Sequence, residues 1–257
     1  MRLAVATLIA LITIGPSPVF AEDLRDSFLD FARGELGAAR IAEPPSAAGK
    51  RSAIGPQLYR RVVESVILVV TKEAIGSGVV VSPKGHILTN WHVVGGHEAV
   101  GVVPRTQELL KGLGQLRKEH ITLARVLAVD PRRDLALLHV PTIPAGLRSV
   151  PLGEPDGVEV GQDVYAIGHP KGLLWSYTEG VVSQIRPNYQ WSYREGSVHQ
   201  ATVIQTQTPM HAGSSGGALF DGGGRVVGIN TALKDPTLGF AIAIGEVREW
   251  VQSLSKR

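Results

Sequence analysis

The chain has 257 residues, of which 44% are hydrophobic and 5% aromatic, and it contains 30 glycines. This length suits one sizeable domain, and many glycines beside few aromatic side chains are typical of strands and turns. The net charge is only +3 with scattered basic residues, so nothing indicates a nucleic-acid partner. Because the chain has no cysteine, disulfides, thiol catalysis and thiolate metal sites are excluded.

Residues 1–21 are predicted to form a signal peptide. Arg2 supplies the positive charge, Leu3 to Ile14 form an apolar core, and Val19-Phe20-Ala21 ends in a small residue that a signal peptidase accepts. The apolar core is far shorter than the roughly 20 residues needed to span a bilayer. We therefore expect cleavage after Ala21, a periplasmic or secreted protein, and no stable membrane insertion after cleavage.

Residues 22–56 are expected to form an N-terminal helical segment followed by a linker. Leu24, Phe28 and Phe31 recur at the spacing of one helix face. The composition of residues 44–50 is that of a linker. The apolar helix face either packs on its own domain or contacts a partner copy or a membrane, and the sequence leaves these alternatives open.

Residues 57–257 are predicted to form one β-rich domain. A short helix over 58–64 precedes the first strand, and a helix over 246–256 closes the chain. Between them, short apolar runs separated by turn residues favour an all-β sandwich or barrel. The predicted strands are 66–71, 78–81, 86–89, 123–129, 135–140, 164–167, 180–185, 202–206, 226–230 and 239–244, with a further strand-like run after residue 217.

The segment from Gly213 to Leu219 holds Ser215 among small residues. Glycines let the backbone turn sharply, and such a loop can present a nucleophilic hydroxyl and aim N–H groups at an oxyanion. By itself, the segment also fits a plain glycine-rich turn or the G-x-S-x-G nucleophile elbow of α/β-hydrolases. The positions of histidine and aspartate decide among these three interpretations.

All eight histidines precede Ser215. This excludes the hydrolase order Ser, acid, His, whereas the order His, Asp, Ser is readily filled. His92 follows a predicted strand, which would hold its ring rigidly. Asp134 abuts the apolar run 135–138, and a buried carboxylate there needs a hydrogen-bond donor such as an imidazole N–H.

Other histidines and acids have simpler interpretations. His86 and His97 match no helical metal-ligand spacing with His92, so neither a metal ion nor another cofactor is expected. Asp130 precedes a proline and is typical of a turn, which leaves Asp134 as the preferred acid.

Eight blocks of the sequence lie in one characteristic order, namely 76–78, 89–94, 134–138, 164–170, 179–183, 213–219, 228–231 and 239–242. Together they resemble the trypsin-like serine proteases of the HtrA (Deg) type. The resemblance implies two six-stranded antiparallel β-barrels of the trypsin/chymotrypsin type, to which the C-terminal helix and the N-terminal helical extension predicted above are added. It also implies that Ser215 is the nucleophile, His92 the base and Asp134 the orienting acid. The backbone N–H groups of Gly213 and Ser215 would form the oxyanion hole, and the protein would be a homotrimer.

The chain departs from the family pattern in several places. HtrA proteins usually carry PDZ domains after the protease domain, whereas this chain ends soon after Ile244, so no PDZ domain is expected. Ser214 stands where the family usually has asparagine, and Gln207 where it commonly has aspartate. Residues 188–196 fall where the family has a regulatory or substrate-contacting loop, although a plain surface loop fits equally well.

The sequence therefore predicts an exported serine endopeptidase that acts on unfolded or damaged polypeptides through an acyl-enzyme. The alternative is a catalytically silent protease fold that serves as a binding or chaperone-like module. Ser214 and Gln207 motivate that alternative, and the intact triad argues against it. Residues 206–212 and 226–233 contain no acid, so we expect a small or medium apolar P1 residue rather than Lys or Arg.

Overall fold

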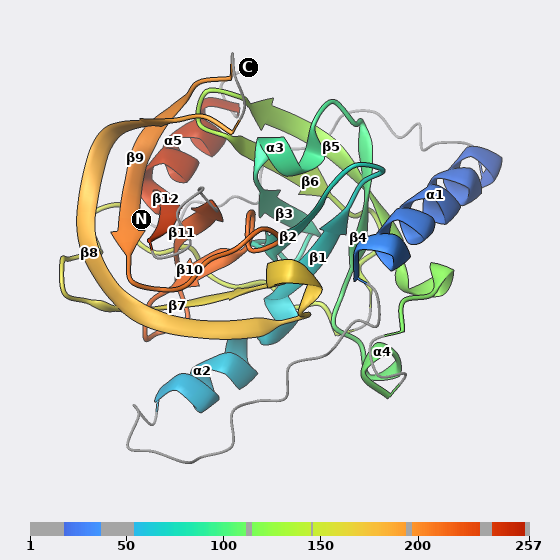
Figure 1. Ribbon diagram of the computed structural model, residues 1–257, viewed down its shortest axis with the longest axis horizontal. Coiled ribbons are helices and arrows are strands. Elements are labelled where there is room, and N and C mark those ends of the chain that lie inside the picture. Colours follow the sequence, from blue (N-terminus) through green and yellow to red (C-terminus); the bar gives the residue numbers. More distant parts are fainter. Residues whose placement is uncertain are drawn as a thin grey trace.

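The computed structural model describes residues 18–36, 54–111, 115–144, 146–193, 197–231 and 238–254, with side chains from Ala21 onward. Two six-stranded antiparallel sheets form the body of the molecule, and helices lie around them (Figure 1). Residues 1–17 of the predicted signal peptide and the predicted linker at 44–50 lie outside the described residues.

The first sheet is formed by the N-terminal half of the chain. Its strands are β1 (Val66–Val70), β2 (Ile75–Val80), β3 (His86–Thr89), β4 (Ala99–Val103), β5 (Thr122–Asp130) and β6 (Leu135–His139). The hydrogen-bonded order β1-β2-β3-β6-β5-β4 returns from β4 to β1, so the sheet closes on itself. Branched side chains such as Ile67, Val69 and Ile87 are fully buried and form one core cluster within it.

The second sheet is formed by the C-terminal half. Its strands are β7 (Asp163–Gly168), β8 (Ser176–Trp191), β9 (His199–Thr206), β10 (Ala218–Phe220), β11 (Val226–Thr231) and β12 (Gly239–Ala243). The order β10-β11-β12-β9-β8-β7 also returns to its start, because β7 pairs with β10. A separate core cluster that includes Val164, Leu219 and Val227 belongs to this sheet.

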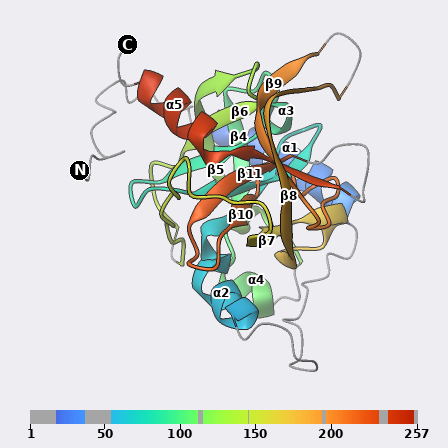
Figure 2. The ribbon, with the colours of Figure 1, turned by 90° about the vertical axis from the view of Figure 1, so that its left-hand side faces the viewer.

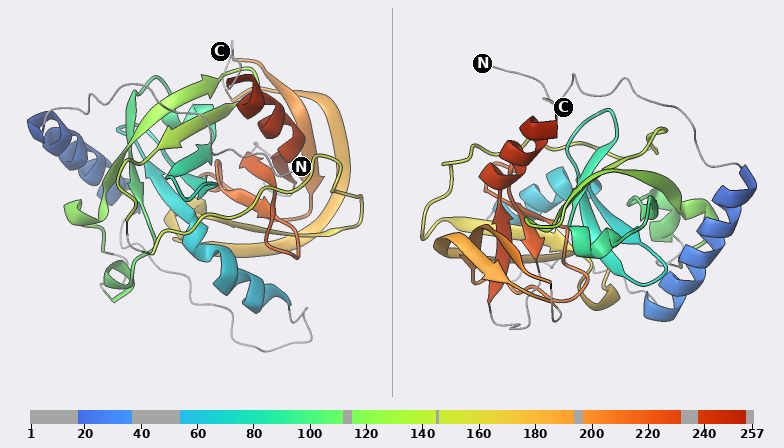
Figure 3. Two further views of the ribbon diagram at one scale, coloured as in Figure 1. Left: turned by 180° about the vertical axis from the view of Figure 1, so that it is seen from behind. Right: turned by 90° about the horizontal axis from the view of Figure 1, so that it is seen from above.

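The N-terminal helix α1 (Pro18–Leu36) packs on the first sheet and begins before the predicted cleavage site. Phe28 is fully buried, and a Cβ built on Gly101 of β4 would lie 3.0 Å from its ring. At the end of α1, Leu36 contacts the short turn η4 (Pro170–Gly172). The apolar face of α1 therefore packs on its own chain, along the flank of the first sheet (Figure 3).

The remaining helices are α2 (Ile54–Val62) with η2 (Val63–Ser65), α3 (Trp91–Val94), α4 (Gln107–Lys111), η3 (Lys118–His120) and the C-terminal α5 (Ile244–Leu254). The helices predicted before the first strand and at the end of the chain are thus present. None of the helices within the described residues combines the length and the apolar character that crossing a membrane requires.

Two strands differ most from the sequence prediction. Strand β4 was not predicted, because Gly101 interrupts its valines, and that glycine is needed where Phe28 approaches. Strand β8 was predicted only for residues 180–185, yet it runs to Trp191 and lies along β9 (Figure 2). Strand β8 continues past Pro187 because the pairing with β9 shifts there by a bulge, at which Asn188 adopts φ +52°. Residues 188–191 of the predicted loop are therefore strand, which corrects that prediction.

Candidate active site

His92 and Asp134 form a hydrogen-bonded pair on the first sheet. The Nδ1 atom of His92 lies 2.8 Å from Asp134 Oδ2, and the His92 backbone N–H donates to Asp134 Oδ1 at 2.9 Å. Asp134 is fully buried, whereas the His92 side chain is 23% exposed. Because a carboxylate only accepts, the ring proton is held on Nδ1, which leaves the Nε2 lone pair available as a base.

The backbone around Asp134 is fixed by the segment that carries His92. The Asp134 carbonyl accepts hydrogen bonds from Asn90 Nδ2 at 2.9 Å and from Trp91 N–H at 3.2 Å. Asp134 adopts φ +57°, a left-handed conformation that is costly for a residue with a Cβ. Since β3 pairs with β6, the sheet register brings the two segments together and the hydrogen bonds hold Asp134 in this conformation.

The loop carrying Ser215 is held against β2 by its backbone. Ser77 N–H donates to Ser215 C=O at 2.8 Å, and Gly216 N–H donates to Asn230 C=O at 2.9 Å. A Cβ built on Gly76 would lie 2.6 Å from Val93 Cγ1 and 3.1 Å from Ser215 O. Strand β2 therefore lies between the serine loop and the helix α3 that carries His92. This packing places Ser215 near the His92–Asp134 pair.

Gly213 occupies a position that accepts only glycine. Its φ is +93°, and a Cβ built there would collide with the carbonyl oxygen of His169. The Gly213 carbonyl accepts a hydrogen bond from Ser77 Oγ at 2.7 Å. This hydroxyl also lies 2.9 Å from Nδ1 of His169, whose pKa is lowered to about 3 by complete burial. Neutral His169 and Ser77 thus support the loop, and the sequence pattern assigned neither of them a role.

Tyr193 approaches the His92–Asp134 pair from the second sheet. Its hydroxyl donates to Asp134 Oδ2 at 3.0 Å and contacts Thr231 Oγ1, and its ring centroid lies 4.2 Å from that of His92. Burial, followed by the charge of Asp134, raises the pKa of Tyr193 well above 10. Sequence reasoning missed this residue, although aromatic residues at 189, 191 and 193 have the period of two typical of a strand.

The other residues singled out in the sequence have structural partners. Asp130 accepts the Arg133 backbone N–H at 3.0 Å and the Arg133 guanidinium at 2.9 Å, so its carboxylate pairs with Arg133, while Asp134 pairs with His92. Ser214 closes a turn, because its N–H donates to the His211 carbonyl at 2.8 Å and its carbonyl accepts from Gly217. Neither departure from the family pattern, at 214 or 207, removes a member of the His92, Asp134 and Ser215 set.

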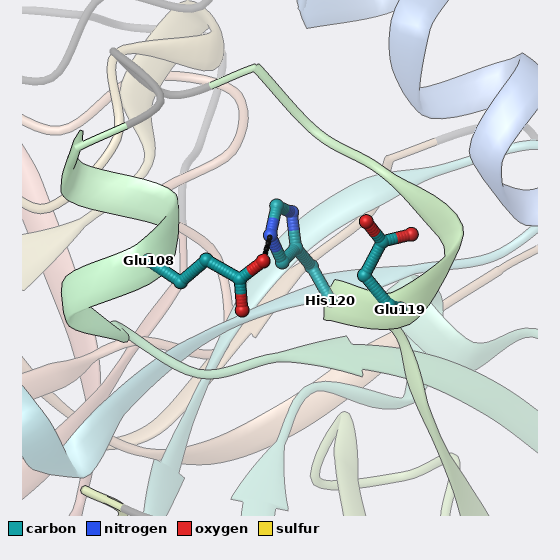
Figure 4. A group of neighbouring side chains, drawn as sticks. All are labelled: Glu108, Glu119 and His120. Carbon is teal, nitrogen blue, oxygen red and sulfur yellow. Dashed lines mark ion pairs between the residues drawn. The ribbon is translucent and has the colours of Figure 1, made fainter.

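A second cluster of titratable groups consists of Glu108, Glu119 and His120 (Figure 4). The two carboxylates of this cluster already pair with a cation, because the Arg117 guanidinium lies 3.4 Å from Glu108 and 3.3 Å from Glu119. His120 Nδ1 accepts the Arg117 backbone N–H at 3.1 Å, which places the proton of the neutral ring on Nε2. Nε2 then has no lone pair for a metal, and the carboxylates are explained as ion-pair partners of Arg117.

A family model described as a trypsin-like peptidase domain matches residues 76–229. The chain belongs to the trypsin-like peptidase family. The magnetosome formation protease MamE of Paramagnetospirillum magneticum is 32% identical to it over 260 residues, which cover 96% of this chain and 33% of MamE. The periplasmic serine endoprotease DegP of Salmonella typhimurium is 33% identical over 187 residues, which cover 68% of this chain and 34% of DegP. This trypsin-like chain therefore spans about a third of the length of these relatives.

Solved structures give the same assignment. The Rv3671c protease in an inactive form has a TM-score of 0.64 at 25% identity, covering 82% of this chain and 98% of that one. The HtrA-type protease AlgW with a tripeptide has a TM-score of 0.61 at 30% identity, covering 77% of this chain and 62% of AlgW. The predictions of an all-β trypsin-like fold and of an HtrA-type serine protease family are confirmed.

Proposed function

We propose that the protein is an exported serine endopeptidase that hydrolyses unfolded or damaged polypeptides. The observation that carries this proposal is the buried Asp134 carboxylate 2.8 Å from His92 Nδ1, close to the loop that presents Ser215. Membership of a peptidase family adds support, since the similar DegP and AlgW chains are described as proteases.

In the proposed mechanism, His92 Nε2 takes the proton of Ser215 Oγ while Oγ attacks the carbonyl carbon of the scissile bond. The imidazolium then protonates the leaving amine as the C–N bond breaks, which leaves an acyl-enzyme. A water molecule gives a proton to His92 and attacks the ester carbon, and the proton returns to Ser215 Oγ as the acid leaves. Asp134 stays ionised and holds the His92 Nδ1–H throughout.

The backbone N–H groups of Gly213 and Ser215 are proposed to bind the oxyanion. In a trans peptide, the N–H points away from the preceding carbonyl, and the described residues contain no cis peptide bond. The carbonyl of Ala212 accepts an N–H from the 170–172 turn, and the carbonyl of Ser214 accepts from Gly217. These bonds fix both peptide planes, so the two N–H groups are oriented before substrate binds.

The proposed substrate has a small or medium apolar P1 residue. Stretch 206–212 carries no acid, and Thr206, Thr208 and Met210 within it are buried. An arginine or lysine side chain would find no countercharge there. Matched peptides with Val, Ala, Phe, Arg or Lys at P1 test this, and faster cleavage after Arg or Lys than after Val or Ala contradicts it.

We further propose that the protein is periplasmic or secreted and begins at Glu22 after export. The signal-peptide pattern of residues 1–21 supports this, as does the similarity to a DegP described as periplasmic. The resemblance to HtrA proteases also supports a homotrimer. Mass spectrometry of the exported protein tests the first residue, and sedimentation of the same sample tests the trimer.

Labelling with a fluorophosphonate tests the nucleophile. Wild type and Ser214→Ala are expected to be labelled, because Ser214 is the matched neighbouring hydroxyl, whereas Ser215→Ala is expected to remain unlabelled. Persistent labelling of Ser215→Ala would contradict the assignment. Casein turnover separates the protease from a silent binding module, since a silent module cleaves no casein under any activating condition.

A further inference from the structure

The hairpin formed by β8 and β9 reaches from the second sheet to the turn that carries Asp134. Beyond the bulge at 187–188, β8 continues to pair with β9, up to Trp191 opposite His199. At the end of this hairpin, Gln200 N–H donates to Arg132 C=O at 2.7 Å, and His199 Nδ1 donates to Pro131 C=O at 2.7 Å. The hairpin is therefore fastened to the β5–β6 turn by two hydrogen bonds.

Tyr193 follows this fastened end and completes the surroundings of Asp134. The Asp134 Oδ1 atom accepts the His92 backbone N–H, and Oδ2 accepts both His92 Nδ1–H and the Tyr193 hydroxyl. Since the phenol has one proton and gives it to Asp134, the contact with Thr231 Oγ1 uses the threonine hydroxyl as donor. The phenol is thus oriented by Thr231 and held above the pair by its ring contact with His92.

We propose that Tyr193 is a positioning residue of the His92–Asp134 pair, with its hydroxyl fixing the carboxylate and its ring fixing the imidazole plane. This inference rests on the proposed function of the pair. It assigns a role to residues 188–193, whose bulge and strand bring a phenol from the second sheet to a site on the first. Because burial keeps the pKa of Tyr193 well above 10, the hydroxyl remains a donor at neutral pH.

Two consequences follow for catalysis. The phenol shares Oδ2 with His92 Nδ1–H, so it withdraws part of the negative charge that stabilises the imidazolium. Removing only the hydroxyl therefore makes His92 easier to protonate and leaves the carboxylate less constrained. The Tyr193 side chain contacts the Asp134 carboxylate and the ring of His199 from β9. Arg133, which lies next to Asp134 in the β5–β6 turn, pairs instead with Asp130, Glu246 and Glu249.

The test compares Tyr193→Phe with Tyr189→Phe as a matched control. Tyr189 lies on the same hairpin and stacks on Phe240 at 5.3 Å, away from the pair. We expect Tyr193→Phe to lower kcat about tenfold, as for a lost hydrogen bond to a charged group, with KM for a short peptide changed by less than about twofold. The acidic limb of the kcat/KM profile is expected to move up by about half a pH unit. Tyr189→Phe leaves both quantities at the wild-type values.

A spectroscopic measurement reports the pair directly. The proton NMR resonance of His92 Nδ1–H is expected to shift in Tyr193→Phe and to stay in place in Tyr189→Phe. An unchanged acidic limb together with an unchanged resonance overturns the role of Tyr193. Fluorophosphonate labelling of the wild type is measured first, because absent labelling overturns the proposed triad itself. If the wild type is labelled but the pH profile of kcat/KM does not move in Tyr193→Phe, only the role of Tyr193 is overturned.

Discussion

The two halves of the candidate site are held in different ways. The serine half is fixed by backbone hydrogen bonds and by glycines at positions with no room for a Cβ, with Gly213 against His169 and Gly216 against Ser77. The acid–base half is fixed by side chains, with the Asp134 carboxylate accepting from His92 and Tyr193. The serine half therefore needs positions without a Cβ atom, whereas the acid–base half needs hydrogen-bond donors to one carboxylate.

This difference predicts how each half fails. Adding a single methyl group to the serine half displaces the backbone, because the neighbouring atoms are themselves backbone. Removing a polar atom from the acid–base half leaves the backbone in place but changes the charge that the Asp134 carboxylate presents to His92. The following substitutions separate these two kinds of failure.

Asp134→Asn is expected to have the largest effect, a loss of about 10⁴-fold in kcat. The neutral amide keeps the shape but no longer forces the His92 ring proton onto Nδ1, so the base presents the wrong tautomer. Steady-state peptide hydrolysis measures the loss, and circular dichroism serves as the folding control. A kcat within about tenfold of wild type would contradict the role of Asp134.

Gly213→Ala is expected to lower kcat by about 10²–10³-fold, the usual cost of losing one oxyanion donor. The matched control is Gly161→Ala, because Gly161 has a similar φ of +88° but nothing within 4 Å of its Cβ position. Both variants carry the strain of a left-handed alanine, roughly 1–2 kcal/mol of stability. Equal kcat values for the two variants would show that strain, and not the collision with His169, limits catalysis.

Arg133→Met is expected to destabilise the fold by about 2 kcal/mol and to change kcat less than the variants above. Arg133 pairs with Asp130 of the same turn, and it joins the β5–β6 turn to α5 through Glu246 and Glu249, all at 2.8–2.9 Å. Without Arg133, the partly buried carboxylates of Asp130 and Glu246 lose their cationic partner. Urea unfolding at neutral pH measures the resulting loss of unfolding free energy. Thermal unfolding of the Glu249→Gln variant is the control, since that side chain is 72% exposed.

This destabilisation is expected to depend on pH. Burial alone would raise the pKa of Glu246, but hydrogen bonds from Arg133 and Thr202 lower it overall from 4.5. A lowered folded pKa stabilises the fold above the unfolded value and loses that contribution as pH falls through the folded pKa. The stability gap between wild type and Arg133→Met should therefore be complete at neutral pH and narrow below 4.5. A gap that widens below that pH would contradict the assignment.

Thr89→Val is expected to have the smallest effect, about 1 kcal/mol of stability and less than about threefold in kcat. Thr89 Oγ1 donates to the Ser77 carbonyl at 2.7 Å, so it touches the serine half through a side chain only. Valine keeps the volume and adds no collision beside Gly216. A loss as large as that of Gly213→Ala would show that this one side-chain hydrogen bond matters to the serine half as much as the space at Gly213 does.

The same difference explains what the sequence could predict. Gly213 and Gly216 adopt positive φ in a sharp turn, so a run of glycines is visible in consecutive letters, although the atoms that crowd them come from distant segments. The hydrogen bond between Asp134 and His92 was also predictable, because an acid beside an apolar strand needs a donor and the histidine order left few choices. Most strands were predicted because their apolar runs are short and bounded by turns.

Tyr193 was not predictable as a partner of Asp134, because the contact joins residues 59 positions apart across two sheets. It depends on the direction of the hairpin after the bulge at Asn188, which the residues of one segment do not determine. The support of Gly213 by Ser77 and His169 was hidden for a similar reason. Each of these residues is ordinary in its own segment, and its role becomes visible only where the two sheets meet.

The hydrogen bond from Gln200 N–H to Arg132 C=O has a consequence for motion. It joins the two sheets through main-chain atoms beside the site, so the amide can exchange its hydrogen only when the hairpin lifts from the β5–β6 turn. The exchange rate of this one amide therefore measures how often the hairpin separates from the β5–β6 turn. A bound substrate analogue that spans both halves should slow that exchange, while the amides in the middle of β1 keep their own rates.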